Sequence, residues 1–357
     1  MTTEHQTATM VYASADALRE FAAQALMRLD VPEEDARIAA DILLESDLRG
    51  IDSHGITRFE QFYVTGIQEG RISPRPTIQT MSEAAATALV DGGGGLGMVV
   101  GYRAMQIAID KAETAGAGFV TVCNSRHFGI AGYYATMALD RNMIGLAMTN
   151  SGPSVVPTFG NEARLGTNPI ALAAPVGRGT PFVLDMATST VAAGKFEVAA
   201  RKGLPVPPGW AGDEQGTPTT DPRLARNGRH YSPLGGSPEM SSYKGYGLGV
   251  MVDILCGVLS GAGSSRQLQQ RGFVGHFFGA LNIETFRPLA DFTAMMDDMH
   301  DDLRNTPPAA AGQRVLVPGD REFATKAERL AKGIPLYPDT VESLRRLSQS
   351  LGVPIEL

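Results

Sequence analysis

Ser53, His54 and Arg58 lie within one short segment and carry side chains that could perform acid–base chemistry on a small organic acid. An imidazole titrates near neutral pH and can exchange a proton with a hydroxyl or carbonyl oxygen, and arginine offers a planar fork that matches a carboxylate. In the alternative, structural interpretation, Ser53 caps a helix that begins near Ile56, and Arg58 pairs with a surface acid such as Glu60. These residues alone leave both interpretations open.

A second candidate segment, residues 124–132, contains His127 and follows an apolar, strand-like run. A glycine-containing turn that opens a helix presents free amide groups to an anion such as pyrophosphate. His127 could orient an oxo group there, or it could be a hydrogen-bonded histidine of the core. The spacing alone favours the structural interpretation, because G-x-x-G is a common turn.

A third candidate group combines Gly166–Pro169, Asp185–Ser189 and Gly194–Lys195. Small polar groups at strand ends can fix a nicotinamide or a substrate, and Asp185 could orient a catalytic histidine or accept a hydrogen bond from a ribose hydroxyl. In the structural interpretation, Thr188 and Ser189 are ordinary helix-capping or turn residues.

Motifs of several other enzyme classes are missing from the sequence. It has no zinc-type spacing and no G-x-S-x-G nucleophile elbow, so metallohydrolase and acyl-transfer chemistry lose their usual support, and no metal site is expected. The glycine run at 92–95 lacks both G-x-G-x-x-G and the Gly-Lys-Ser/Thr of a P-loop, and we interpret it as a strand-to-helix turn.

Composition narrows the class of partner. The chain has 357 residues, a net charge of −7 and 43% hydrophobic residues, which predicts a folded globular protein with large cores. Without a run of Lys or Arg, nucleic acid is not an expected partner. The N-terminus lacks a signal-peptide pattern and no window approaches a membrane span, so we expect a soluble, cytoplasmic protein without membrane contact.

Periodicity indicates the elements that must position these residues. Helical patterns at both ends of the chain surround a strand-rich middle. The stretch 205–242 is turn-rich, and we interpret it as an ordered excursion over a site, because long loops in compact domains tend to be functional. We expect helices at residues 14–29, from the Asp30–Glu34 cap to Gly50, and at residues 59–69, about 97–115, 133–139, 245–259 and 288–357, the last with a break at 318–320. We expect strands at residues 84–90, 119–123, 144–148, 170–174, 182–185 and 273–281.

Taken together and in this order, the motifs resemble the malate/L-lactate dehydrogenase family, NAD(P)-dependent oxidoreductases that do not use a Rossmann fold. The match runs nearly end to end. It consists of DSHGITR at 52–58, SRHFGIAGYY at 125–134, GTNPIA at 166–171, DMATS at 185–189, GW at 209–210, PTTDP at 218–222, YKGYGL at 243–248, GHFF at 275–278 and PGD at 318–320.

The resemblance implies an α/β, non-Rossmann fold, with a mainly antiparallel sheet in the cofactor domain and a helical domain built from both chain termini. We place the helical domain at residues 1–75 plus 287–357 and the NAD(P)-binding and substrate domain at residues 76–286. The resemblance also implies a homodimer.

The activity implied by the resemblance is hydride transfer between a nicotinamide, NAD or NADP, and a small 2-oxo or 2-hydroxy acid. By resemblance, His54 is the proton donor to the developing alkoxide, Ser53 supports it, Asp185 is a third member of the relay, and Arg58 holds the substrate carboxylate. Thr167 and Lys195 are implied as neighbours of the substrate or nicotinamide. Cofactor contacts are implied at His127, Phe128, Gly129, Ile130, Ala131, Asp185, Met186, Ala187 and Gly319, the last within the turn at 318–320.

Two other functions compete with this prediction. Members that reduce a cyclic imine carboxylate, such as piperideine or pyrroline-2-carboxylate, resemble this sequence in SHG and DMATS as well. A non-catalytic nicotinamide-binding protein is the second alternative, and the intact Ser53, His54 and Arg58 argue against it. No local rule separates NAD from NADP, because the acidic residue that marks this choice belongs to Rossmann folds.

Overall fold

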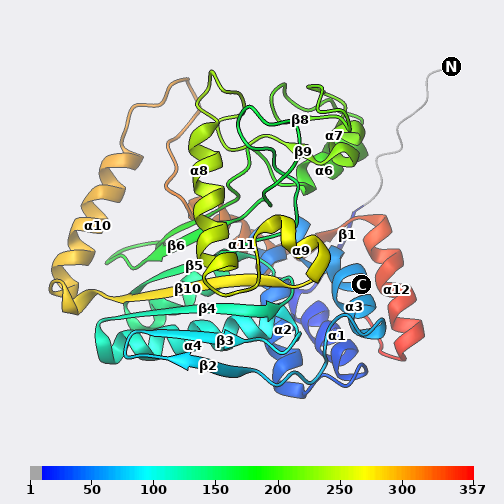
Figure 1. Ribbon diagram of the computed structural model, residues 1–357, viewed down its shortest axis with the longest axis horizontal. Coiled ribbons are helices and arrows are strands. Elements are labelled where there is room, and N and C mark those ends of the chain that lie inside the picture. Colours follow the sequence, from blue (N-terminus) through cyan, green and yellow to red (C-terminus); the bar gives the residue numbers. More distant parts are fainter. Residues whose placement is uncertain (1–9) are drawn as a thin grey trace.

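A seven-stranded sheet forms the middle of the molecule (Figure 1). The computed structural model describes the backbone of residues 10–357, and the side chains of all of these except residues 201–202 and 269–271. The strand order is β2-β3-β4-β10-β5-β6-β7, and only the pair β3–β4 is parallel. The strands are β2 (Gln79–Glu83), β3 (Thr87–Asp91), β4 (Ala117–Ser125), β5 (Met143–Thr149), β6 (Ile170–Ala174), β7 (Phe182–Met186) and β10 (Val274–Asn282). The α/β class and the mainly antiparallel sheet are confirmed.

One strand of this sheet was not expected from the sequence. Every residue of β2 is exposed, so the strand lacks the alternation of apolar and polar residues on which sequence prediction depends. The other six strands lie where the apolar runs predict them, within a few residues.

Two helices cover one face of the sheet, α4 (Gly97–Ala115) and α5 (Ala131–Met137). The approach is very close, because a Cβ atom on Gly118 or Gly145 would overlap the backbone carbonyl groups of Ala108 and Ala135. Glycine is therefore required at these positions by helix-to-sheet packing.

The glycine run before α4 is a strand-to-helix turn. Its amide groups are already engaged: Gly93 N donates to Asp91 Oδ1 at 2.8 Å, Gly94 N to Asn124 O at 2.8 Å and Gly95 N to Gly92 O at 3.0 Å. A loop with its N–H groups used internally has none to offer a phosphate.

Segments from both chain ends form a helical layer beside the sheet. Its helices are α1 (Ala15–Met27), α2 (Glu33–Leu48), α11 (Asp320–Lys332) and α12 (Pro338–Leu351), and the short strands β1 (Val11–Ala13) and β11 (Ile334–Leu336) pair antiparallel. Contacts of α1 with α12 and of α2 with α11 confirm a helical unit built from both termini. The domain boundaries at 75/76 and 286/287 stay predictions.

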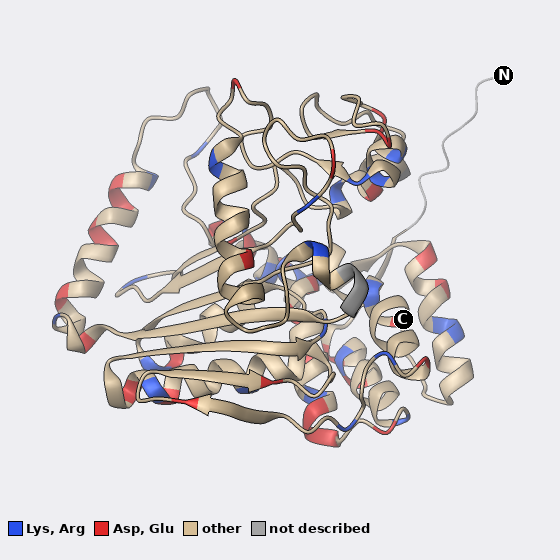
Figure 2. Ribbon diagram, viewed as in Figure 1, with Lys and Arg blue, Asp and Glu red and all other residues tan. Residues whose placement is uncertain are grey.

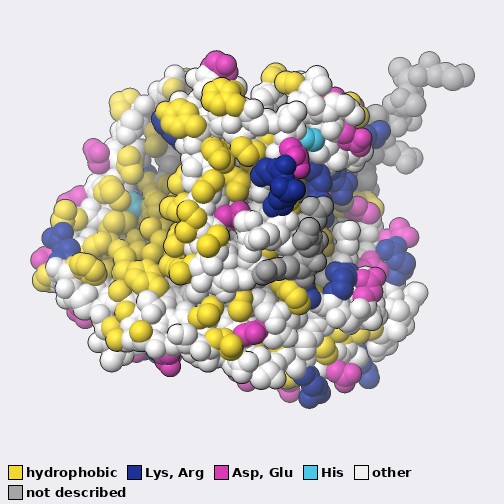
Figure 3. All heavy atoms as spheres, viewed as in Figure 1, with side chains coloured by type: hydrophobic (Ala, Val, Ile, Leu, Met, Phe, Trp, Pro, Cys, Tyr) yellow, Lys and Arg dark blue, Asp and Glu magenta, His cyan; other side chains and the backbone are white. Residues whose placement is uncertain are grey.

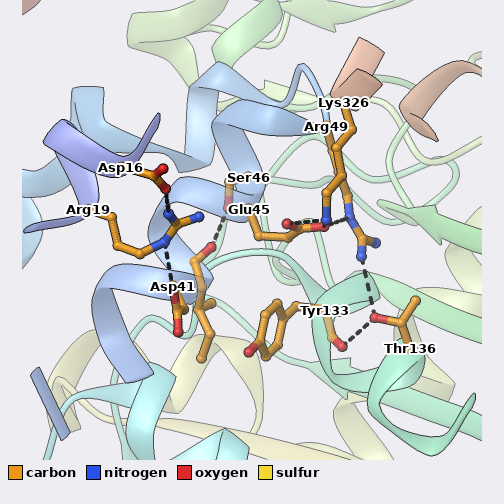
Figure 4. A network of polar contacts seen from close by, with 10 residues as sticks. Asp16, Arg19, Asp41, Glu45, Ser46, Arg49, Tyr133, Thr136 and Lys326 are labelled. Atoms are coloured by element: carbon orange, nitrogen blue, oxygen red, sulfur yellow. Dashed lines mark hydrogen bonds and ion pairs between the residues drawn. The ribbon is translucent and has the colours of Figure 1, made fainter. Parts of the chain in front are cut away.

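A buried polar network fixes this helical layer to the sheet domain (Figure 4). Arg49, at the end of α2, bonds Glu45 at 2.7 Å and reaches Thr136 of α5 at 3.4 Å, while Lys326 of α11 bonds the same Glu45 at 2.7 Å. The Arg49 and Glu45 side chains are only 9% and 11% exposed. The network therefore holds the C-terminal end of α2 in place, and the chain continues from there into the Ser53–His54 segment.

The remaining elements lie across the other face and the far edge of the sheet (Figure 1). The excursion over 205–242 is ordered, as expected, and its short elements pack around Phe196, Trp210 and Tyr231. Within residues 10–357, no helix is long and apolar enough to cross a membrane. The elements are α6 (Gly194–Lys202), β8 (Ala211–Gly212), α7 (Pro222–Gly228), β9 (His230–Tyr231), α8 (Tyr243–Val252), the π-helix η5 (Asp253–Val258), α9 (Ser265–Arg271), η6 (Ile283–Thr285) and α10 (Leu289–Arg304); η4 (Ala138–Arg141) follows α5.

Candidate active site

Two short 3-10 turns and a π-helix carry the first candidate cluster. They are η1 (Asp52–His54), η2 (Ile56–Arg58) and η3 (Phe59–Val64), and a short helix α3 (Thr65–Gln68) follows. The buried Asp47 carboxylate accepts a hydrogen bond from Ile56 N at 2.7 Å, and a Cβ atom on Gly55 would overlap this carboxylate. The turn between η1 and η2 is therefore built against Asp47 and has room only for glycine.

The contacts of Ser53 and Arg58 contradict the structural interpretation of this segment. The Ser53 hydroxyl lies 2.9 Å from His54 Nδ1 and caps no helix. Arg58 pairs with Glu197 and not with Glu60. Ser53 and Arg58 are thus directed to His54 and to the partly buried Glu197.

His54 and His127 lie face to face, with ring centroids 5.6 Å apart and planes 24° from parallel. Phe62 packs edge-on against His127 at 5.2 Å, and Arg58 lies over the Phe62 ring at 5.3 Å. The fold therefore joins the segment after α2 with the turn before α5, which are about 70 residues apart in sequence. Stacked imidazoles were not predicted from either motif alone.

Hydrogen bonds define the tautomer of His127. Tyr63 Oη lies 2.7 Å from His127 Nδ1, and Gly129 N donates to the same nitrogen at 3.3 Å. Since an amide N–H can only donate, Nδ1 is an acceptor and the neutral ring carries its proton on Nε2. Among the described residues nothing bonds the Nε2 atom of either histidine, so both atoms are available to a ligand.

Both imidazoles are neutral at physiological pH. Burial, with a further contribution from the positive charge of Arg58, lowers the pKa of His54 to about 4. Burial, together with the neighbouring His54, Arg58 and His276, lowers the pKa of His127 to about 3. Burial and the nearby arginine therefore disfavour the imidazolium form of both rings.

Arg58 is held by two contacts. Its Nε donates to Ser53 O at 2.9 Å, and its Nη2 bonds Glu197 Oε1 at 3.0 Å. The Arg58 side chain is only 14% exposed. A fork fixed in this way is oriented before a substrate arrives, which reduces the entropy lost on binding a carboxylate.

Asp185 does not contact His54. Its Oδ2 accepts a hydrogen bond from Gly132 N, in the first turn of α5, at 2.7 Å, and the described residues contain no bond between Asp185 and His54. Burial raises the pKa of Asp185 to about 6. The structure therefore places this carboxylate at the start of α5, where it makes no contact with the predicted Ser53–His54 relay.

The other predicted residues lie along β7 or just after it, except Lys195. Thr167 O accepts hydrogen bonds from the backbone and hydroxyl of Thr188, just after Met186 and Ala187. The turn with Gly319 lies alongside β7 as well, since Val183 N donates to Pro318 O at 3.0 Å. Lys195 is exposed in the first turn of α6, next to Gly194, which packs directly against Ser53.

The turn at 125–131 is held from behind by a stack of aromatic rings. Phe128 lies between Tyr134 at 4.8 Å and His276 at 4.6 Å, and Gly129, Ile130 and Ala131 are buried with it. His276 bonds Ser125 and Thr149 at 2.7 and 2.8 Å and is fully buried, so it is a packed residue of the core. Phe128 thus holds the backbone next to His127 in place, and its ring is too deeply buried to offer much surface to a ligand.

Sequence reasoning missed Tyr63, Glu197 and Asp47. Tyr63 follows Phe62 on η3, and no motif marks it, because a π-helix shifts the faces on which side chains fall. Glu197 comes from α6, over a hundred residues from Arg58. Only Asp47 carried a signal in the sequence. It is an acid in the last turn of a helix, where a negative charge opposes the helix dipole.

Comparison with known proteins identifies the family to which this fold and these motifs belong. The malate/L-lactate dehydrogenase family model matches residues 13–345. The chain belongs to the malate/L-lactate dehydrogenase family.

Named relatives support the same assignment. Malate dehydrogenase of Pyrococcus abyssi is 47% identical over 343 residues, covering 95% of this chain and 94% of that protein. L-sulfolactate dehydrogenase of Methanocaldococcus jannaschii is 41% identical over 337 residues, covering 93% and 94%. The crystal structure of malate dehydrogenase from Entamoeba histolytica superposes with a TM-score of 0.95 at 37% identity, covering 98% of this chain and all of that one.

Membership of the malate/L-lactate dehydrogenase family makes the chain a 2-hydroxy acid oxidoreductase that uses a nicotinamide cofactor. It also explains a Gly-rich turn without G-x-G-x-x-G, since this family binds its cofactor without a Rossmann fold. Among the described residues, no group of three or more His, Cys, Asp and Glu side chains could hold a metal ion.

Proposed function

We propose that the junction of the Ser53–Arg58 segment with the turn at 125–131 is the active site of a dehydrogenase for small 2-oxo and 2-hydroxy acids. The observation that carries this proposal is the stacked pair of neutral imidazoles beside a fixed guanidinium. A bound reduced nicotinamide supplies the hydride. Arg58 binds the carboxylate of the acid, and an imidazole gives a proton to the oxygen on which negative charge develops.

His54 is the proposed proton donor, since its Nδ1 is bonded to Ser53 and its Nε2 has no partner in the part of the chain that the structure describes. A specific observation supports His127 as a second candidate: its Nε2 carries the ring proton in the neutral form. The imidazole that gives this proton does so as imidazolium, after taking up a proton from solvent, and the neutral imidazole that remains is the base that accepts the hydroxyl proton in the oxidation direction. We retain Asp185 in the site as a residue that fixes the start of α5.

For the cofactor, we propose that Thr167, Lys195, Met186 and Ala187 lie near the nicotinamide and that Gly319 lies near the adenosine end. Met186 and Ala187 are partly exposed at the end of β7, and Thr167 O bonds Thr188 just beyond them. Gly319 has φ of 104°, and it is buried where the turn packs against β7, since a Cβ atom there would lie 3.1 Å from Pro181 O. The cofactor is proposed to be NAD or NADP.

The direct test measures the loss of NADH or NADPH absorbance after mixing with the purified protein. The substrates added in turn are oxaloacetate, sulfopyruvate, pyruvate and piperideine-2-carboxylate. We expect turnover with an open-chain 2-oxo acid and with one cofactor preferred. Turnover restricted to the cyclic imine would contradict the proposed substrate class, and cofactor binding without any turnover would favour a non-catalytic protein.

The lowered pKa values predict an unusual pH dependence for the oxidation direction. The base that accepts the hydroxyl proton must be unprotonated, and a pKa of about 4 keeps His54 unprotonated down to about that pH. We therefore expect kcat/KM for hydroxy-acid oxidation to stay level as pH falls from 8 to 6, and to decline only near pH 4. A decline with a midpoint near 6.5, the value of an ordinary histidine, would show that neither histidine behaves as described.

We also propose that the enzyme is a homodimer. Hydrophobic side chains gather over α8, η5 and α10 (Figure 3), and monomeric proteins rarely expose so many together. The exposed large hydrophobic residues on these elements are Tyr243, Met251, Ile254, Val258, Met295, Met299 and Leu303. A second copy that presents the same face would bury them in a symmetric contact.

Light scattering with size-exclusion chromatography tests this. We expect a mass of twice 37.9 kDa for the wild type and a shift toward the monomer for Ile254→Asp, which places two charges in a symmetric interface. Leu330→Asp is the matched control, because Leu330 is similarly exposed, at 59% against 52% for Ile254, but lies on α11. A monomeric wild type, or equal behaviour of the two variants, would contradict the proposal.

A further inference from the structure

Asp253, the first residue of the π-helix η5, is a buried carboxylate outside the proposed site. The helix η5 packs against β4, β5 and β10, and these strands carry no Lys, Arg, Asp or Glu (Figure 2). Within the described part of the chain, Asp253 has no Lys or Arg partner. Burying a charge without a counter-ion is costly unless hydrogen bonds replace those to water.

The hydrogen bonds that offset this cost come from two residues. Ser265 Oγ donates to Asp253 Oδ1 at 2.8 Å, and Asn150 Nδ2 donates to the same oxygen at 3.1 Å. Ser265 N donates to Asp253 Oδ2 at 3.0 Å. Burial raises the pKa of Asp253, and these bonds, which favour the charged form, oppose the rise. The carboxylate therefore serves as an acceptor that fixes its donors in place.

The Ser265 hydroxyl connects Asp253 to the segment that contains Thr167. Gly166 N donates to Ser265 Oγ at 2.9 Å. Since the hydroxyl proton is directed to Asp253, the oxygen has a lone pair free to accept this bond. A Cβ atom on Gly166 would lie 2.2 Å from Ser151 Oγ, so the backbone here is closely packed on its other side as well.

Asn168 holds the other end of this segment. It is fully buried and has a φ of 38°, in the left-handed region. Its Oδ1 accepts a hydrogen bond from Ser151 N at 3.1 Å, and its Nδ2 donates to Gly249 O at 2.9 Å. The backbone is thus fixed by side-chain contacts on both sides of Thr167.

The same network continues to the turn that carries His127. Asn150 Oδ1 accepts a hydrogen bond from Gly275 N at 3.0 Å. The next residue, His276, bonds the Ser125 hydroxyl at 2.7 Å, at the start of that turn. A continuous set of buried contacts therefore joins two segments of the proposed site.

We propose that Asp253 is a positioning residue for hydride transfer, and that it holds Thr167 in place through the Ser265 hydroxyl. This inference rests on the proposed function, in which Thr167 lies near the nicotinamide. Hydride transfer needs the reacting carbons held close together, and a displacement of about 1 Å can cost about 10²-fold in rate. Asp253 itself contacts neither reactant and acts only through its hydrogen bonds.

The first test is Ser265→Ala, which removes the hydroxyl between Asp253 and Gly166. We expect kcat for oxaloacetate reduction to fall about 10- to 100-fold, because Thr167 is displaced. KM should stay within about threefold, because Arg58 keeps its bonds to Ser53 O and to Glu197.

Ser260→Ala is the matched control for this variant. Ser260 is also buried, and its hydroxyl also accepts a backbone bond, from Ala262 N at 3.1 Å, but it makes no bond to residues 166–168. Chemical denaturation should show similar losses of stability in the two variants, while kcat should fall only in Ser265→Ala. Equal kcat in the two variants would overturn the proposal.

Asp253→Asn tests the carboxylate itself. This variant keeps an oxygen that can accept from Ser265 but loses the negative charge, so kcat should lie between those of the wild type and Ser265→Ala. Because both changes act through one contact, the double variant should have the kcat of Ser265→Ala alone. Losses that multiply in the double variant would show that Asp253 does not act through Ser265, and the proposal would be wrong.

The fluorescence of bound NADH or NADPH distinguishes this inference from the proposed function, since it needs no turnover. Its emission reports the surroundings of the reduced nicotinamide and should change in Ser265→Ala but not in Ser260→Ala. This change in a wild type that reduces no 2-oxo acid would reject the proposed function and keep the positioning role. An active wild type, with kcat and emission unchanged in Ser265→Ala, would do the reverse.

Discussion

Replacing His54 by alanine is expected to lower kcat/KM for 2-oxo acid reduction by about 10²- to 10⁴-fold, the usual contribution of a positioned acid–base group. The loss should fall on kcat, because Arg58 keeps both contacts that orient it, to Ser53 O and to Glu197. Cofactor binding should persist. Steady-state kinetics, together with the fluorescence of bound NADH or NADPH, measure both quantities.

Two further variants make this result specific. His230→Ala removes an imidazole on β9 outside the proposed site and should leave kcat/KM unchanged. His127→Ala tests the second candidate, whose Nε2–H tautomer is held by Tyr63 and Gly129. Wild-type kinetics in His54→Ala with a large loss in His127→Ala would transfer the proton donor to His127, and wild-type kinetics in both would remove the pair from the mechanism.

Much of the fold follows from local patterns in the sequence. The apolar runs at 144–148 and 170–174 predict β5 and β6 because buried strands leave short hydrophobic blocks. The exposed strand β2 has no such block and could not be predicted. The pairing of β1 with β11 joins three-residue strands from opposite ends of the chain, and no local signal specifies such a contact.

The candidate site was predictable in its residues but not in its contacts. His54 and His127 each belong to a motif, yet their stacking depends on how the helical layer sits on the sheet. The same holds for Glu197, which meets Arg58 only after α6 folds back over the η2 turn. Asp185 illustrates the limit of a motif, since its carboxylate bonds the backbone of Gly132 and makes no bond to His54.

Gly55 shows how a residue without a side chain controls the positions of His54 and Arg58. Gly55→Ala is expected to destabilise the fold by about 1–3 kcal/mol and to lower kcat/KM by about 10²-fold, because overpacking a buried contact costs that much and a shift of about 1 Å can cost that rate. The added methyl group would overlap the Asp47 carboxylate. This carboxylate cannot yield easily, because it is buried, its pKa is raised well above the usual range by desolvation, and it accepts a bond from Ile56 N.

The turn must therefore move instead, and it carries Ser53 and His54 on one side of Gly55 and Arg58 on the other. Chemical denaturation measures the stability change, and the same protein samples give the kinetics. Gly152→Ala is the control, because nothing lies within 4 Å of a Cβ atom built there and its φ is not in the left-handed region. A stable, fully active Gly55→Ala enzyme would mean that Asp47 does not set the geometry of the turn, and the rigid placement of His54 relative to Arg58 would lose its physical basis.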